Sequence, residues 1–307
     1  MRGLLIHPGE LTYRWIDRMA DAGVDVLGIH SEGGTESVAS LDRLLMLLET
    51  KEYRELIDYA IDVRGLRIEY EFHAAGWLLP RDMFDTFPEY FRMDANGARV
   101  REIDFCRTNT AAVDFVAERA ASLAKRLYRS SHRYYFWLDD NAELCHCDKC
   151  RAMSPSDAQL TVMNAIVRRL RRDIADAKLA CLAYQKFIEP PKTVRPEEGI
   201  FLEFAPIKRD MSRSAFEGEE LKCVDALLEF FGKTDAKVLE YWYDNSLLSK
   251  WKKPPKPFFA NSGMIRGDLA YYESKGFEHI SSFACFLGDD YEALYGDVDI
   301  SAFGRIN

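Results

Sequence analysis

Eight short apolar runs, rich in β-branched and aromatic residues, alternate with longer helical segments along the 307 residues of the chain. This alternation limits the fold more than any other feature. Strands separated by helices pair in parallel, and they either close into a (β/α)8 barrel or form an open doubly wound sheet. The predicted strands are Gly3–His7, Val24–His30, Leu66–His73, Arg133–Asp140, Lys178–Gln185, Gly199–Pro206, Ala236–Asp244 and Glu278–Phe286.

The residues between these strands favour the barrel over the open sheet. Pro8 and Gly9 follow the first strand, where a dinucleotide-binding fold would have a glycine-rich turn, and no phosphate-binding glycine loop occurs elsewhere. Polar residues follow nearly every strand, as a ring of loops around one mouth requires. We therefore predict an α/β fold, a single-domain (β/α)8 TIM barrel over residues 1–307, without a linker.

Composition excludes several classes of protein. The net charge of −9 is unsuited to nucleic acid, which needs clustered basic residues, and the basic run Arg168–Arg172 reads as a solvated helix face. No apolar run approaches the roughly 18 residues of a membrane span. The first ten residues lack the apolar core of a secretory signal, so we expect a cytoplasmic protein.

The polar strand ends predict where chemistry occurs, because catalytic groups of a barrel come from strand C-termini and the loops behind them. Glu69, Glu71 and His73 share one face of their strand, since side chains alternate with a period of two. The same rule places Glu240 and Asp244 on one face of the seventh strand. Any one of these carboxylates could instead cap a helix or pair with an arginine. Together with many aromatic residues, they fit glycoside hydrolysis, which needs two carboxyl groups.

Three cysteines follow the fourth strand in a C-x-C-x2-C pattern, at Cys145, Cys147 and Cys150. Structural zinc takes four ligands, often thiolates, so a fourth must come from elsewhere. Cys106, in the neighbouring loop, is the first choice and His146 the second. The alternative is that these cysteines are free. We expect a structural zinc ion and no organic cofactor.

Several motifs together resemble one family. They are H-x3-W-x2-P from His73, the run Pro88–Phe91, Cys106 with Thr108-Asn109, the strand-end Asp140, the cysteine triplet, and the run from Glu240 to Trp251. Their order is similar to that in a bacterial family of uncharacterised proteins described as glycoside hydrolases, with a barrel related to α-glucuronidases and β-hexosaminidases. The resemblance spans about residues 66 to 286, and it implies the barrel and, by analogy, the reaction. Hexosaminidases carry an Asp-Glu pair after the fourth strand, whereas this chain has Asp139-Asp140.

The leading hypothesis is a glycoside hydrolase acting on an oligosaccharide or glycoside that contains uronic acids or amino sugars. Asp140 is the predicted general acid, with Asp139 as the second choice. Glu240 is the predicted base or nucleophile, with Asp244 and Glu203 in reserve. The predicted sugar-binding residues are His30, Glu71, His73, Trp77, Arg107, Asn109, Tyr184, Trp242 and Tyr243.

Two alternatives stay open. One is a carbohydrate-binding barrel without turnover. The other is a metal-dependent lyase or isomerase in which His7, His30 and His73, with nearby carboxylates, hold a catalytic ion.

Overall fold

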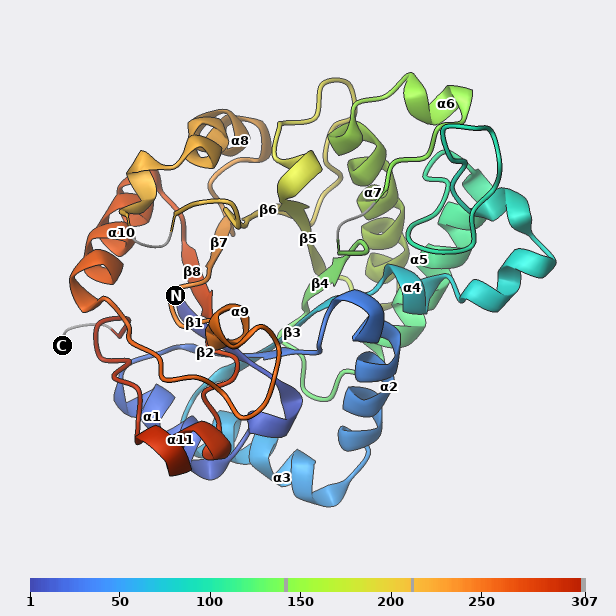
Figure 1. The fold of residues 1–307 in the computed structure, drawn as a ribbon. Coiled ribbons are helices and arrows are strands. Elements are labelled where there is room, and N and C mark those ends of the chain that lie inside the picture. The colour runs from blue at the N-terminus through green and yellow to red at the C-terminus, as the bar shows by residue number, and fades with distance from the viewer. Residues whose placement is uncertain (141–142, 211–212, 305–307) are drawn as a thin grey trace.

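Eight parallel strands close into a barrel in the order β1 to β8, and helices surround it (Figure 1). A computed structural model describes residues 1–140, 143–210 and 213–304. The prediction of a (β/α)8 barrel is therefore confirmed. The strands are β1 (Arg2–Ile6), β2 (Val26–His30), β3 (Arg67–His73), β4 (Arg133–Trp137), β5 (Lys178–Ala183), β6 (Ile200–Phe204), β7 (Lys237–Glu240) and β8 (His279–Phe283).

The helices occupy the connections between strands. They are α1 (Tyr13–Asp21), α2 (Ser37–Leu47), α3 (Lys51–Asp58), α4 (Ala75–Leu78), α5 (Thr110–Ala124), α6 (Asp148–Arg151), α7 (Pro155–Asp173), α8 (Val224–Phe231), α9 (Asn245–Ser249), α10 (Ser262–Lys275) and α11 (Asp289–Tyr295). A π-helical turn, Tyr59–Val63, continues α3. Short 3₁₀ turns lie at Pro8–Glu10, Gly34–Glu36, Arg81–Asp85, Pro88–Tyr90, Gln185–Phe187, Ala215–Glu217 and Glu219–Cys223. Within the described residues, no helix has the length and apolar character needed to cross a membrane.

Local sequence explains where the long helices begin. The side chains of Thr12, Asn109, Ser154 and Asn261 each accept a backbone N–H in the first turn of the helix that follows. Such N-caps satisfy amide groups that have no partner inside the helix. Gly276 ends α10 at a φ of +98°, a left-handed conformation that favours glycine.

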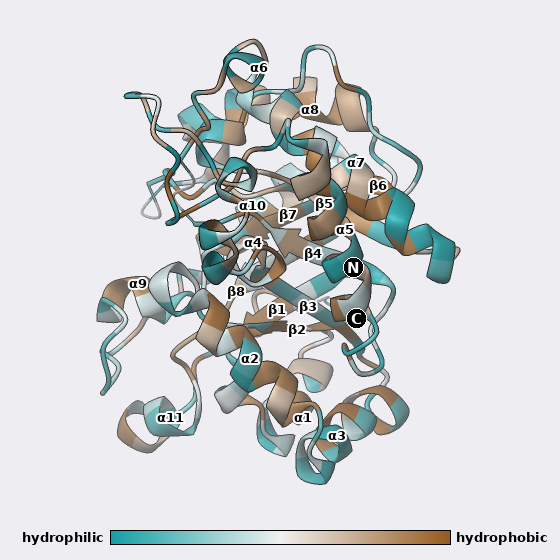
Figure 2. Cartoon of the chain, turned by 90° about the vertical axis from the view of Figure 1, so that its right-hand side faces the viewer, coloured by the Kyte–Doolittle hydropathy of each residue, from teal (hydrophilic) through white to brown (hydrophobic). Residues whose placement is uncertain are grey.

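The apolar core has two layers. The larger fills the space between strands and helices, and the smaller fills the inside of the barrel with residues such as Leu5, Leu182 and Phe283. Figure 2 shows α9 at the side of the barrel where the strands end, whereas the N-terminus lies at the opposite side. The C-terminal ends of the strands and the loops that follow them therefore form the mouth of the barrel.

Candidate active site

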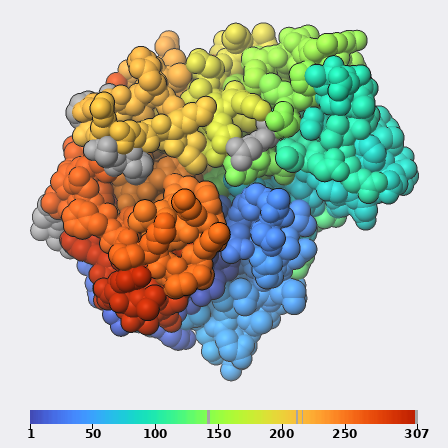
Figure 3. All heavy atoms as spheres, in the orientation of Figure 1, coloured from blue at the N-terminus to red at the C-terminus, as the bar shows by residue number. Residues whose placement is uncertain are grey.

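A cavity of about 470 Å³ opens at the C-terminal ends of the strands. Figure 3 shows, at this face, the blue segment after β2 beside the orange segment after β7. The cavity is lined by strand-end residues (His7, His30, His73, Trp137, Leu182, Ala205, Leu239, Phe283, Cys285 and Phe286) and by loop residues (Gly33, Gly34, Thr35, Glu32, Glu36, Asp140, Tyr184, Tyr241, Ser246 and Trp251). A second cavity of about 640 Å³ shares His7, Glu32, Trp251 and Phe286 with it, so the two form one longer cleft.

Three histidines form a stepped row along one side of the cavity. His7 Nδ1 donates to the backbone carbonyl of His30 (2.9 Å), and His30 Nδ1 donates to that of Glu71 (2.8 Å). His73 Nδ1 donates to the carbonyl of Leu138 (2.5 Å). A carbonyl oxygen only accepts, so every Nδ1 carries a proton. Burial, with His7 and His73 nearby, holds the pKa of His30 well below 6.5, so His30 is neutral and its Nε2 is an acceptor.

Asp140 is the predicted catalytic carboxylate that reaches the cavity. Tyr184, also predicted to bind sugar, donates its hydroxyl hydrogen bond to Asp140 Oδ1 (3.1 Å). The Gln185 amide donates in turn to the Tyr184 hydroxyl (2.9 Å). Burial, and then the Asp140 charge, raise the pKa of Tyr184, which therefore stays a protonated donor. The structure thus brings Asp140, Tyr184, His30 and His73 together.

Asp139, the neighbour of Asp140, has a different environment. Its carboxylate pairs with Arg81 and accepts the backbone N–H groups of Gly76 (3.1 Å) and Asp104. It does not line the cavity. Asp139 therefore ties the end of β4 to the long segment that follows β3.

Glu240 lies behind β7, away from the cavity, and this differs from its predicted place. Lys237 and Leu239 point into the barrel, so alternation turns Glu240 outward toward α10. There it accepts the Tyr272 hydroxyl (2.5 Å) and lies 3.3 Å from an Arg209 nitrogen. Burial raises the pKa of Glu240 to about 7.

The residues after Glu240 leave the strand. Trp242 donates its indole N–H to Asp268 of α10 (3.0 Å), and Tyr243 is buried against Phe303. Asp244 caps α9 by accepting the Ser246 N–H (2.9 Å). None of these predicted residues lines the cavity. Tyr241, which is not among the predicted residues, lines it instead, because the chain turns directly after β7.

Glu71 and Glu203 lie below the cavity, inside the barrel, and both are fully buried. Lys237 pairs with Glu71 and lies 3.3 Å from Glu203. Trp137, on the floor of the cavity, donates its indole N–H to Glu203 (2.7 Å). Burial raises the pKa of Glu71, against the opposing effect of Lys237. A buried carboxylate needs such partners, so these two glutamates form part of the barrel core.

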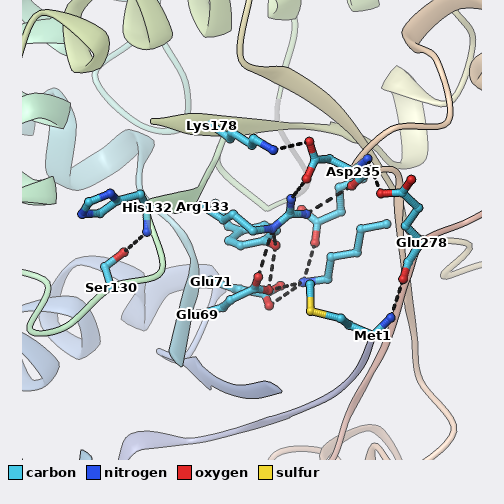
Figure 4. Close-up of polar contacts among 12 residues, drawn as sticks. Met1, Glu69, Glu71, Ser130, His132, Arg133, Lys178, Asp235 and Glu278 are labelled. Atoms are coloured by element: carbon cyan, nitrogen blue, oxygen red, sulfur yellow. Dashed lines mark hydrogen bonds and ion pairs between the residues drawn. The ribbon is translucent and has the colours of Figure 1, made fainter. Parts of the chain in front are cut away.

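This polar core continues to the N-terminal end of the barrel. Arg133 lies between Glu69 (3.1 Å) and Asp235 (2.5 Å), as Figure 4 shows. Lys178 also contacts Asp235 (2.5 Å). Acidic and basic side chains therefore pair with one another along the whole length of the barrel interior.

Three more predicted sugar-binding residues make structural contacts within the long connection between β3 and β4. Trp77 donates to Asp42 (2.8 Å) and packs under Arg119. Arg107 is buried and pairs with Asp104, so it is not available to a substrate carboxylate. Asn109 caps α5. None of the three lines the cavity.

The four cysteines predicted as metal ligands come together. The Sγ atoms of Cys106, Cys145, Cys147 and Cys150 all lie within 4.8 Å of one another. His146, the other choice for the fourth ligand, is not in this group. Among the described residues, the one other group of this kind is Asp235, Glu278 and His279, so His7, His30 and His73 do not converge on a common point.

The fold and cavity define a (β/α)8 barrel with a polar mouth at the strand C-termini. The model of the family described as "Domain of unknown function (DUF4838)" matches residues 49–284, which is more than half of the chain. The chain therefore belongs to that family. No curated protein matches it.

Solved structures with a similar barrel include several glycoside hydrolases. A β-N-acetylhexosaminidase from Bacteroides fragilis is similar at 12% identity, with a TM-score of 0.55; the match covers 92% of this chain and 60% of that one. An endo-glycoceramidase II from Rhodococcus sp. matches at 11% identity and a TM-score of 0.49, over 92% and 72% of the two chains. A module of the pneumococcal exo-β-D-N-acetylglucosaminidase matches at 10% identity and a TM-score of 0.49, and the match covers 98% of this chain and 81% of that one. This chain thus spans less than two thirds of the hexosaminidase, and the likeness shows the fold.

Proposed function

We propose that this protein is a glycoside hydrolase in which Asp140 is the general acid. The observation that carries the proposal is the placement of Asp140 in the cavity, where the Tyr184 hydroxyl fixes the orientation of its carboxyl group. Cleavage of a glycosidic bond requires a carboxyl group that protonates the leaving oxygen. The histidine row and the aromatic rings of Trp137 and Tyr241 supply polar acceptors and apolar faces for a sugar beside it.

The second carboxylate of the reaction is assigned to Glu32. Glu203 and Glu240, which the sequence favoured, do not line the cavity. Glu203 is held by Lys237 and the Trp137 indole, and Glu240 by Tyr272. Besides Asp140, the described carboxylates that line the cavity are Glu32 and Glu36, both after β2. Glu32 is two residues beyond His30, and its pairing with Arg43 (3.0 Å) holds its carboxyl group beside the cavity, where a base or nucleophile would be needed.

The charge of the cavity favours a neutral sugar over a uronic acid. Its described lining holds three carboxylates and three histidines, with no arginine or lysine. Recognition of a sugar carboxylate usually uses an arginine fork. Arg107, predicted for that role, is occupied by Asp104. Neutral hexoses and N-acetylhexosamines are therefore the first substrates to test.

The test compares Asp140→Asn with the parent on two sets of glycosides. Loss of a general acid should lower turnover by about 10²–10⁴-fold where the leaving alcohol is poor. It should lower turnover much less on nitrophenyl glycosides, whose leaving group needs no proton. Glu143→Gln, an exposed carboxylate three residues further along, is the matched control and should behave as the parent. Equal losses on both sets would remove Asp140 from the acid role.

A sugar-binding barrel without turnover is the second candidate. The observation that favours it is the absence of Glu240, Asp244 and Glu203 from the lining of the cavity, because these were the expected partners of Asp140. Calorimetry with oligosaccharides, followed by chromatography after long incubation, separates the two. Binding with intact sugar supports the second candidate.

A further inference from the structure

Four cysteines from two separate loops meet outside the cavity. Cys106 comes from the segment before α5, and Cys145, Cys147 and Cys150 come from the connection between β4 and α7. The Cys106 Sγ lies 3.7 Å from that of Cys147 and 4.0 Å from that of Cys150. Tetrahedral zinc with Zn–S bonds of about 2.3 Å places its sulfurs about 3.8 Å apart. The spacing therefore fits four thiolates around one ion.

The surroundings of the sulfurs point the same way. The Met93 backbone N–H donates to Cys145 Sγ (3.3 Å), and the Thr108 hydroxyl lies 3.2 Å from Cys150 Sγ. Hydrogen-bond donors aimed at sulfur are the usual outer shell of a metal thiolate site, because they stabilise the negative charge. Cys106, Cys145 and Cys150 are each at most 9% exposed. Buried thiolates packed this closely need a cation between them.

We infer that Cys106, Cys145, Cys147 and Cys150 bind one zinc ion in a structural site. Four thiolates fill the tetrahedral shell and leave no open position for a substrate. None of the four lines the cavity. The site is therefore independent of the hydrolytic reaction, and its role is to join two loops.

The loops that the ion joins are those behind the catalytic strand end. The segment between α4 and α5 has only short 3₁₀ turns as its helical elements, and it extends outward beside α5 and α6 (Figure 1). At its inner side, Asp139 accepts the N–H groups of Gly76 and Asp104. At its outer side, the His146 N–H donates to the Met93 carbonyl (2.8 Å), next to the cysteines. Zinc would close this outer side and hold the segment against the loop that carries Asp140.

Metal analysis of the full chain tests the inference. After purification with a thiol reductant, we expect about one zinc per chain by plasma mass spectrometry. Cys147→Ser, at the least buried of the four positions, should reduce bound zinc to near zero. Cys223→Ser is the matched control, since Cys223 is half-buried outside the cluster, and it should keep one zinc.

Cobalt and chelator measurements keep the test decisive if Cys147→Ser fails to fold. Cobalt added to the parent protein should give the thiolate charge-transfer and visible bands of a tetrahedral site, and zinc should abolish them. A strong chelator should release zinc and lower the melting temperature of the parent. Zinc-free protein without cobalt bands, disulfides among the four cysteines, or bound iron in place of zinc would each overturn the assignment.

Discussion

At the scale of single residues, Trp251 is the exposed aromatic side chain best placed to bind a sugar. It is 66% exposed and lines both cavities, at the point where they join. Aromatic contacts are worth about 0.5–1.5 kcal/mol. Trp251→Ala should therefore raise KM for an oligosaccharide up to about tenfold. KM for a nitrophenyl monosaccharide, which is too short to lie across the junction of the two cavities, should rise less.

Phe259→Ala is the control for that prediction. Phe259 is 88% exposed, lies on the same connection between β7 and α10, and lines neither cavity. Both variants should keep the parent melting temperature, because the side chains are exposed. An equal KM increase in the two variants would contradict a specific role for Trp251.

At the scale of elements, the end of β4 holds two adjacent aspartates with different tasks. Asp139 joins β4 to the segment after β3 through Arg81, Gly76 and Asp104, and its side chain is 11% exposed. Asp139→Asn should destabilise the fold by about 1–3 kcal/mol, because it weakens a partly buried charged network. Urea unfolding of Asp139→Asn and Asp140→Asn measures the contrast. A larger loss of stability in Asp140→Asn would contradict this division of tasks.

The elements also show how far the sequence can predict this protein. All eight strands were predicted, because runs of strand-forming residues between capped helices are a local signal. The shared face of Glu69, Glu71 and His73 is also confirmed by the structure, where the glutamates point into the barrel and His73 reaches the mouth. The meeting of Cys106 with the cysteine triplet was predicted from the adjacency of the two loops, and the sulfurs do gather.

The predicted position of Glu240 at the mouth of the barrel is wrong. The alternation of side chains along a strand tells which residues share a face, but it does not tell which face points into the barrel. Glu240 and Asp244 were expected on one face of a longer strand, but β7 ends at Glu240 and the chain turns. Lys237 was the signal that could have fixed the direction, since its inward position requires Glu240 to point outward. Nothing local shows that a lysine lies inside a barrel, because three glutamates from β3 and β6, far away in the sequence, make that position possible.

At the scale of the whole molecule, buried carboxyl groups make stability depend on pH. Burial raises the pKa of Glu240 to about 7, from 4.5 as its ordinary value. Between pH 4.5 and about 7, the folded protein therefore keeps a proton on Glu240 that the unfolded chain has released. The stabilisation that this group contributes is fully present below pH 4.5 and is lost as the pH rises to about 7. Burial also raises the pKa values of Glu71 and Glu203, so these two groups likewise make the protein less stable as the pH rises.

A comparison of Glu240→Gln with the parent isolates this contribution from those of the many surface carboxylates. Glutamine keeps the size of the side chain and can still bind Tyr272, but it does not titrate. The parent should lose stability relative to Glu240→Gln between pH 4.5 and 7, as measured by urea unfolding at several pH values. Glu229→Gln, at an exposed position of α8, should keep a constant difference from the parent across the same range. A constant difference for Glu240→Gln as well would show that folding does not raise the pKa of Glu240, and that Arg209 offsets the effect of burial.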